Sequence, residues 1–455
     1  MTGLATHESG PDSSTSLIAA APSPQPPPAI FSFPDELLVE IAAAGQRDRD
    51  PAPVDQFQSE WNLSHVSRRF RDAIIGAPTL WTLVTVKLRV EGSVELFKLY
   101  LERSRACKIR VTLYEMSYRV MHMDSHFIAH QLRHLVPHIG RIWRLRLVSE
   151  VQESMDAMLV PFRDVAAPAL EHLAIESYDQ LDIPMNIFSS GAPNLTFFKL
   201  SSCILNFPVP PWTTHLTHLD LRSCSDSHDS EGNSFLSTFL TQCPALAHFF
   251  LDTTVMGLNR MKIPSLESLT VVTSNDGDAL DLRRTFHDFE MPLLSSLVVQ
   301  YTHGDQISAL FNQTSHLSFP ALTSLSFVNG GCECEYVSEN RAVFQTISSP
   351  PLRLFPILSS LTLINQCFTE DILSDILGPT SQPWPSLKSV SICPKEGKLE
   401  VVYSTLQQVV RSRRQSQAAL PNLWLSPPLF AKGYWEENGV DVELFDCSDL
   451  VAALH

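Results

Sequence analysis

One short apolar pattern recurs along most of the chain and limits what the chain can fold into. In Pro320–Phe327, P-A-L-T-S-L-S-F, a proline is followed by apolar residues at the third, sixth and eighth positions, and Pro356–Leu363, P-I-L-S-S-L-T-L, repeats the arrangement. The same template fits further segments: Pro168–Ile175, Pro193–Leu200, Pro244–Leu251, Pro264–Val271, Pro292–Val299, Pro385–Ile392 and, without the proline, His215–Leu221. The alternating L-x-L end predicts a short strand with one buried face, and a proline before a strand costs no ladder hydrogen bond. One unit cannot bury its apolar face alone, so the pattern predicts a stack of repeats.

The third position of each unit is a leucine. These leucines are Leu170, Leu195, Leu216, Leu246, Leu266, Leu294, Leu322, Leu358 and Leu387. Successive ones are about 20 to 36 residues apart, mostly within the period of a leucine-rich repeat. Two units add a cysteine three residues after the last leucine, at Cys203 and Cys224. The pattern resembles the leucine-rich repeat family, L-x-x-L-x-L-x-x-N/C, over more than half the chain. The resemblance implies an irregular α/β solenoid over residues 141–430, with parallel strands on its concave face and helices and loops outside.

The composition narrows the possible partners and locations. The chain has 33 basic and 49 acidic residues, a net charge of −16. Phosphate-rich partners need clustered lysine and arginine, so we expect neither a nucleic acid nor a membrane as a partner. No apolar run approaches the roughly 18–20 residues of a membrane helix, and no secretory signal is visible. The 9 cysteines lack framework spacing, which favours a reducing compartment. We therefore expect the cytoplasm, the nucleus or both.

The N-terminal part predicts a disordered tail followed by helices. Residues 1–29 are rich in serine and proline, as in a disordered spacer. Phe31–Gly45 then has a proline and two acidic residues suited to a helix start, and a glycine suited to its end. A second helix is predicted from about Gln58 to Ile75, where apolar residues recur at helical spacing.

These two segments resemble an F-box, assigned here to residues 30–83. The matching stretches are F-P-D-E-L-L-V-E-I, Phe33–Ile41, and L-S-H-V-S-R-R-F-R-D-A-I-I-G-A-P-T-L-W, Leu63–Trp81. The resemblance implies a small helical module that binds a Skp-type adaptor and, through it, a cullin in a RING ubiquitin ligase. The implied adaptor-binding residues are Phe33, Pro34, Leu37, Leu38, Ile41, Leu63, Val66 and Phe70, rimmed by Arg68, Arg69 and Arg71. The alternative is that these residues build the core of the module, and we expect the set to divide between the two roles.

The chain departs from the F-box pattern between the two helices. The family has a short apolar segment there, whereas Gly45–Gln58 is polar and interrupted by prolines. Only Val54 and Phe57 can substitute for its apolar side chains. Whether this segment still permits adaptor binding is the open question that the sequence raises.

Residues 84–140 predict a linker with degenerate first repeats. Val84–Leu88 and Lys108–Leu113 alternate as strands, and Ser93–Arg103 is amphipathic. Residues 122–138 carry five histidines four residues apart: His122, His126, His130, His134 and His138. No glutamate occupies the position that an H-E-x-x-H zinc site needs, so a solvated helix face is favoured over a metal site. Residues 431–455 are expected to cap the end of the repeat array, with Tyr434, Trp435, Val442 and Leu444 packed there.

Residues between the core leucines predict a binding face. In the first half of the array this face is charged and aromatic, as in a recognition surface, whereas in the second half it is small with one apolar column. The predicted target-binding residues are Phe197, His218, Arg222, His248 and Phe250. The alternative is that these residues are incidental, because any open sheet presents side chains to solvent.

Taken together, these features predict a protein without chemistry of its own. No nucleotide-binding loop or nucleophile elbow is present, and we expect no catalytic residue, no cofactor and no metal. The expected function is a substrate-recognition subunit of a Skp/cullin/F-box type ubiquitin ligase, in which the F-box binds the adaptor and the repeats bind a target protein. The alternative is a protein-interaction scaffold outside any ligase, with a degenerate F-box.

Overall fold

A computed structural model describes two compact units, Met1–Leu80 and Trp81–His455. The described residues are 33–47, 59–88, 92–115, 125–183, 186–205, 209–226, 235–252, 262–272, 290–300, 319–328, 355–364, 373, 377, 386–394, 397–416, 420–430, 434–437 and 440–445. The expected N-terminal tail and most of the Gly45–Gln58 segment lie outside these residues.

The first unit is built of short helices: α1 Asp35–Arg47, α2 Ser59–Ser64, α3 Arg68–Gly76 and the 3-10 turn η2 Pro78–Trp81, whose last residue begins the second unit. The prediction of one helix from Gln58 to Ile75 is wrong, because the segment is divided into α2 and α3. Ser67 stands at the break in extended conformation, and its side chain accepts a hydrogen bond from the Phe70 N–H at 3.2 Å. A serine at this position accepts a hydrogen bond from a backbone N–H that has no partner within the helix. Ser67 therefore caps α3, which begins as a separate helix.

The second unit contains one parallel sheet. The helices and turns along it are α4 Ser93–Arg103, α5 Ser125–Leu132, η3 Val136–Arg141, α6 Gln152–Leu159, η4 Val160–Phe162, η5 Pro211–His215, α7 Phe235–Thr241, α11 Leu399–Gln415, α12 Pro427–Phe430 and α13 Tyr434–Glu437. The strands are β1 Leu83–Lys87, β2 Ile109–Glu115, β3 Ile142–Ser149, β4 His172–Asp182, β5 Phe197–Leu205, β6 His218–Arg222, β7 Ser225–Asp226, β8 His248–Asp252, β9 Ser268–Val272, β10 Ser296–Gln300, β11 Ser324–Val328, β12 Ser360–Ile364, β13 Ser389–Cys393, β14 Asn422–Leu425 and β15 Val442–Leu444.

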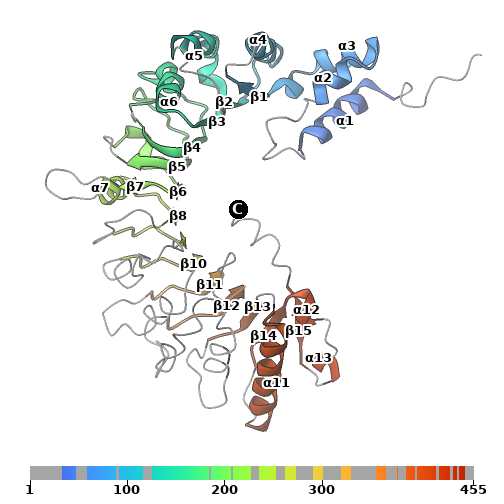
Figure 1. The fold of residues 1–455 in the computed structure, drawn as a ribbon, viewed down its shortest axis with the longest axis vertical. Coiled ribbons are helices and arrows are strands. Elements are labelled where there is room, and N and C mark those ends of the chain that lie inside the picture. The colour runs from blue at the N-terminus through green and yellow to red at the C-terminus, as the bar shows by residue number, and fades with distance from the viewer. Residues whose placement is uncertain are drawn as a thin grey trace, which may run out of the picture. The chain divides into compact units, whose positions relative to one another are not determined.

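The strands follow one another across the sheet in chain order, apart from β7, which pairs with β5. Figure 1 shows β1 to β6 side by side, with α4, α5 and α6 along one side of them. The predicted α/β class with a parallel sheet is confirmed, and the arrangement is consistent with a solenoid-like repeat. The amphipathic segment Ser93–Arg103 is also a helix, α4.

Each repeat begins with a tight turn that the proline pattern only partly indicates. In the turn before β11, the Leu322 N–H donates to the Phe319 carbonyl at 3.2 Å, so Pro320 is the second residue of a four-residue turn. Proline is favoured there because its φ is fixed near the required value. The residue before the proline is buried in repeat after repeat: Ala167, Ala192, Cys243, Ile263, Met291, Phe319 and Phe355. This second core position was not predicted, although an apolar residue before each proline is visible in the sequence.

Hydroxyl side chains connect successive repeats where the strands begin. The Thr323 hydroxyl donates to the Ser295 carbonyl at 3.1 Å, and the Ser359 hydroxyl donates to the Thr323 carbonyl at 3.1 Å. Thr217 donates in the same way to the Thr196 carbonyl at 3.1 Å. These bonds satisfy strand-entry carbonyls and fix the register of one repeat on the next.

The core lies on one face of the sheet. The repeat leucines Leu170, Leu195, Leu216, Leu246, Leu266, Leu294, Leu322 and Leu358 are fully buried, and only Leu387 is half-buried. In each strand the side chains of alternate positions point to this core, as period-two geometry requires. We call the other face the open face; on each strand it carries the positions in register with Phe197, Lys199 and Ser201 of β5.

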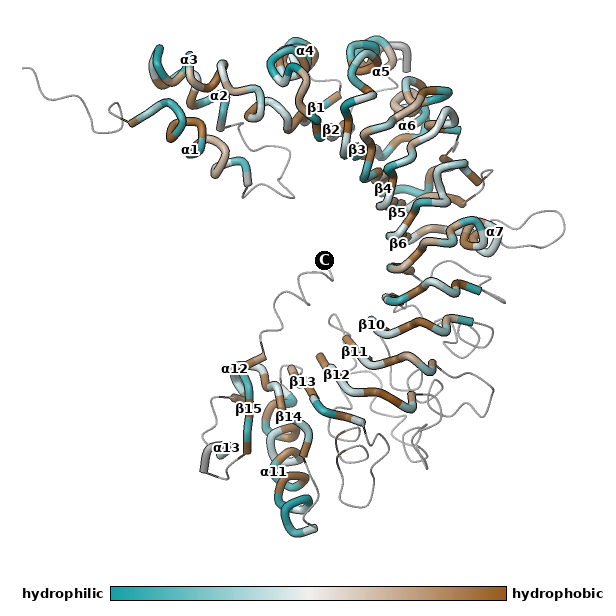
Figure 2. The backbone as a smooth tube through the Cα atoms, turned by 180° about the vertical axis from the view of Figure 1, so that it is seen from behind, coloured by the Kyte–Doolittle hydropathy of each residue, from teal (hydrophilic) through white to brown (hydrophobic). Residues whose placement is uncertain are grey.

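The end of the array is closed by helices and a last strand. Trp435 is buried, donates from Nε1 to the Leu429 carbonyl at 2.9 Å, and packs edge-on against Tyr403 and Tyr434. Figure 2 shows hydrophobic and hydrophilic stretches alternating along α11, which carries Tyr403. The expectation that Leu444 packs there is wrong: its side chain is 53% exposed, because β15 is the outermost strand of the sheet.

Candidate functional site

The helical unit divides its apolar side chains between a core and a surface. Leu38 on α1 and Phe70 on α3 are buried, so these two predicted adaptor contacts lie in the core of the unit. Other predicted contacts remain open to solvent: Phe33 is 37% exposed, Leu37 48%, Ile41 44% and Val66 56%. Pro34 is exposed and Leu63 is half-buried. Since a single exposed apolar residue is ordinary but several on so small a unit are not, these residues are candidates for a docking site.

Polar contacts fix the arrangement of the helices beneath this surface. Arg69 of α3 forms an ion pair with Asp35 of α1 at 2.8 Å and also donates to the Phe33 carbonyl at 2.5 Å. At the other end of α1, the Gln46 amide donates to Glu60 on α2 at 2.9 Å and to the Leu80 carbonyl at 2.8 Å. Arg69 is therefore held by α1, whereas Arg68 and Arg71 are exposed on α3.

One exposed aromatic residue of this unit was not predicted. Trp61 on α2 is 40% exposed, and its ring lies 5.0 Å from that of His65. Tryptophan is enriched at the centres of protein interfaces, so a solvent-facing one adds to the candidate surface. The tryptophan is visible in the sequence, but it lies just outside the matched F-box stretch and so was not selected.

The predicted target-binding residues meet on the open face of β5, β6 and β8. The register places Phe197 beside His218 and His218 beside His248. The rings of His218 and His248 are stacked with centroids 4.2 Å apart, and Phe197 lies 6.2 Å from His218. The ring row continues to His172 on β4, 5.4 Å from Phe197. Trp143 on β3 then packs edge-on against His172 at 5.7 Å.

Two further rows beside the rings carry paired charges, one with Asp220 and Phe250 and the next with Glu176 and Arg222. The Arg222 guanidinium carbon is 4.4 Å from the centroid of the Phe250 ring, and its Nε lies 3.1 Å from Asp220 Oδ1. Burial raises the pKa of Asp220 although Arg222 acts in the opposite direction. Two contacts hold Glu176, from Arg146 at 2.8 Å and Lys199 at 3.3 Å. Burial opposes the ionisation of Glu176, but these two cations outweigh it and lower its pKa.

The imidazoles of His172 and His218 favour the neutral form. Burial lowers the pKa of His218, and the neighbouring imidazoles of His248 and His172 lower it further. Burial also lowers the pKa of His172, and the nearby Arg144 adds to the effect. A neutral His218 imidazole packs against its neighbours without charge repulsion, so its geometry and its lowered pKa agree.

The second half of the open face differs in character. The ring row gives way to a row of serines in register, Ser268, Ser296, Ser324, Ser360 and Ser389. The predicted apolar column is present, but Val328 and Ile364 are only 1% and 0% exposed. Phe445, just after β15, packs against this pair. The column is therefore covered and does not present an apolar surface to a partner.

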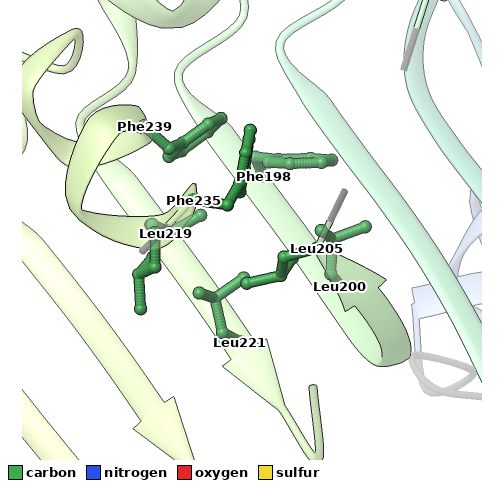
Figure 3. A pocket seen from close by; sticks show the side chains of 8 residues that line it. Phe198, Leu200, Leu205, Leu219, Leu221, Phe235 and Phe239 are labelled. Carbon is green, nitrogen blue, oxygen red and sulfur yellow. The ribbon is translucent and has the colours of Figure 1, made fainter. Parts of the chain in front are cut away.

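A small apolar gap lies on the core side of the same strands. Figure 3 shows Phe235 and Phe239 of α7 together with Phe198 of β5 and Leu219 of β6 around the gap. The gap has a volume of about 10 Å³ and is lined entirely by apolar side chains. It has room for about one water molecule and offers it no polar partner, so it is a packing gap and not a ligand site.

Three histidines of the predicted row lie in one described stretch of the chain but not on one helix. His130 is on α5, His134 in the following turn and His138 in η3, so the predicted single helix face is wrong for these residues. His122 lies outside the described residues. Among the side chains that the structure describes, no group of three or more His, Cys, Asp or Glu could hold a metal ion. Within the same part of the chain, every helix is too short or too polar to cross a membrane.

Comparisons with known proteins add little beyond the fold. No protein-family model matches the chain, and no curated protein matches it. Among solved structures, the chain is similar to a protein from Bacteroides fragilis whose crystal structure comes from the Northeast Structural Genomics Consortium. The two share 13% sequence identity over 68% of this chain and 75% of the other, with a TM-score of 0.32. A likeness at this level carries no argument about function.

Proposed function

We propose that this chain is the substrate-recognition subunit of a Skp/cullin/F-box type ubiquitin ligase. The helical unit binds a Skp-type adaptor, and the open face of the sheet binds a target protein. The observation that carries the proposal is the exposed apolar group Phe33, Leu37, Ile41 and Val66 on a unit whose core is already closed by Leu38 and Phe70. The F-box resemblance of the same residues supplies the kind of partner.

The proposed mechanism is proximity. The adaptor and cullin carry the ubiquitin-charged enzyme, and the repeat array holds the target near it. Holding two reactants together raises their effective concentration without any catalytic residue in the holding subunit. In this proposal the protein therefore needs no cofactor and no metal, and it acts in the cytoplasm, the nucleus or both.

The test is a pull-down of the purified protein with a Skp-type adaptor. Leu37→Ala combined with Ile41→Ala should abolish binding and leave the fold intact, because both side chains are already 48% and 44% exposed. The matched control is Val160→Ala combined with Leu293→Ala, which removes equally exposed apolar side chains from the second unit. Loss of binding in both double variants would contradict the assigned surface.

A scaffold without ligase function is the second candidate. The observation that favours it is the polar Gly45–Gln58 segment, where an F-box has apolar residues. It predicts that the folded wild-type protein does not bind the adaptor at any concentration tested. In that outcome the open face would still be the interaction surface, but the protein would join partners without recruiting a cullin.

A further inference from the structure

The apolar column of the open face is buried where an uncovered sheet face would leave it exposed. Val328 on β11 and Ile364 on β12 are neighbours in register and are only 1% and 0% exposed. The serines that begin the same two strands, Ser324 and Ser360, lie on the same face and are half-buried. Side chains four residues apart on a strand share a face, so the difference means that a further group covers the column near the ends of the strands.

Part of this cover comes from the residue that follows the outermost strand of the sheet. Phe445 comes directly after β15, is half-buried and packs against the column, as Val298 of β10 and Cys393 of β13 also do. The Phe445 N–H donates to the Leu425 carbonyl of β14 at 2.8 Å, which continues the pairing of β14 with β15. Val298 and Cys393 belong to the neighbouring repeats, whereas Phe445 brings its ring to the column from beyond the last strand.

The segment that carries this ring, Val442–Phe445, is held by few contacts, and we call it the strap. β15 is the outermost strand of the sheet and pairs with β14 at three positions. Val442 is half-buried, whereas Glu443 and Leu444 are exposed. A short edge segment with few buried apolar contacts opens at a small cost in free energy. Phe445 can therefore leave the column while the repeats remain folded.

We propose that the strap occupies a second binding site for the target protein. In the free chain Phe445 fills this site. In the complex, an extended segment of the target takes the place of the strap beside β14 and lays an aromatic side chain over Val328 and Ile364. Strand addition at a sheet edge supplies backbone hydrogen bonds, and a side-chain site beside it supplies selectivity. This inference rests on the proposed function only in naming the bound protein as a ligase target.

The test supplies the strap as a separate peptide to the full-length chain. The probe is Val-Asp-Val-Glu-Leu-Phe, the sequence of Val440–Phe445, and saturation-transfer NMR measures its binding because the method detects weak complexes. The Phe445→Ala variant lacks the ring that fills the site, so it should transfer magnetisation to the ring of the peptide. The wild-type chain should give a signal at least about tenfold weaker, because its own strap is present at a high effective concentration.

Controls separate occupation of the site from a change in folding. Leu444→Ala shortens the neighbouring exposed side chain and should behave as the wild type does. A peptide with alanine in place of phenylalanine should bind neither chain. If Phe445→Ala does not fold, Phe445→Leu keeps an apolar side chain at the same position and takes its place in the test.

Three results would overturn the inference: equal signals from the wild type and the Phe445 variant, equal signals from the two peptides, or no signal from the folded variant. Dimers of the variant that form with rising concentration, without a peptide signal, would identify a second copy of the chain as the occupant and would also overturn it. Adaptor binding is measured separately, so a failure of the ligase proposal leaves the peptide result intact.

Discussion

Arg222 lies over the ring of Phe250, with its guanidinium carbon 4.4 Å from the ring centroid. The same arginine reaches back to Asp220, which is directly across from Phe250 in the register of β6 and β8. The contact joins two repeats on the open face, beside the stacked His218 and His248. Such a cation–π contact is worth about 0.5–1 kcal/mol at an exposed site. The contact therefore stabilises the fold only modestly. It does fix the positions of both side chains on the surface that a partner would contact.

The first prediction concerns this pair. Arg222→Ala and Phe250→Ala should each lower the free energy of unfolding by about 1 kcal/mol, with a coupling of roughly 0.5–1 kcal/mol between them. Urea unfolding of both single variants and the double variant measures the coupling. The double variant should also lose target capture without unfolding. Additive effects on stability, together with unchanged target capture, would contradict this assignment.

The second prediction concerns pH. Burial lowers the pKa of His172 and His218 in the folded state, whereas the unfolded chain titrates near 6.5. Arg144 adds to the effect at His172, and the neighbouring imidazoles add to it at His218. Between the folded and unfolded pKa values the unfolded chain binds more protons, so stability rises with pH. The contribution of the two neutral rings to the free energy of unfolding is complete above about pH 6.5 and declines as the pH falls below this value. Urea unfolding at neutral and mildly acidic pH measures this decline.

The groups that act on these imidazoles define the control. His172 faces Arg144, Arg110 and Glu171, and His218 faces His248 and His172. His218→Gln should reduce the loss of stability at acidic pH, since one titrating ring is removed. His215→Gln, which removes an exposed histidine from η5, is the matched control variant. Identical profiles for wild type and His218→Gln would show that the ring row does not govern the acid response.

The third prediction concerns the start of α3. Ser67→Ala removes the acceptor for the Phe70 N–H and should destabilise the helical unit by about 1 kcal/mol. Ser67→Asp keeps an acceptor at the same position and should preserve stability. Thermal unfolding of the three proteins measures the difference. If aspartate is as damaging as alanine, Ser67 matters for packing and not for capping.

The fourth prediction concerns the cover over the apolar column. Phe445→Ala removes a half-buried ring from Val328 and Ile364 and should cost roughly 1–2 kcal/mol. Leu444→Ala, one residue earlier, removes a side chain that is 53% exposed and should change stability little. Dye binding to exposed apolar surface should rise only in the Phe445 variant. Equal behaviour of the two variants would mean that other residues cover the column.

The repeats were predictable because their chemistry is local. A proline that fixes φ and a leucine two residues later determine a turn and a buried side chain within a single unit, as at Pro320 and Leu322. The break between α2 and α3 was missed because the apolar period runs unbroken through Ser67, while the serine's hydrogen bond decides the local structure. Helical periodicity alone does not detect a cap.

The site was only partly predictable for a different reason. Which residues face outward follows from period two, so Phe197, His218 and His248 could be selected from the sequence. That Arg110 and Arg144 are neighbours depends on the pairing of β2 with β3, which brings together residues more than thirty positions apart in the sequence. This pairing also has a register irregularity at Ile109 and Arg110. The covering of Val328 and Ile364 by Phe445 depends on a contact between distant parts of the chain. Neither relationship has a local signature.

The last strand has a consequence for behaviour in concentrated solution. β15 is only three residues long and places Glu443 between Val442 and Leu444 at the edge of the sheet. An exposed strand edge invites pairing with another molecule, and short, charged edges resist it. The long parallel sheet therefore ends at an edge that offers few backbone groups to a second copy. Lengthening β15 or neutralising Glu443 would convert this end of the molecule into a template for self-association.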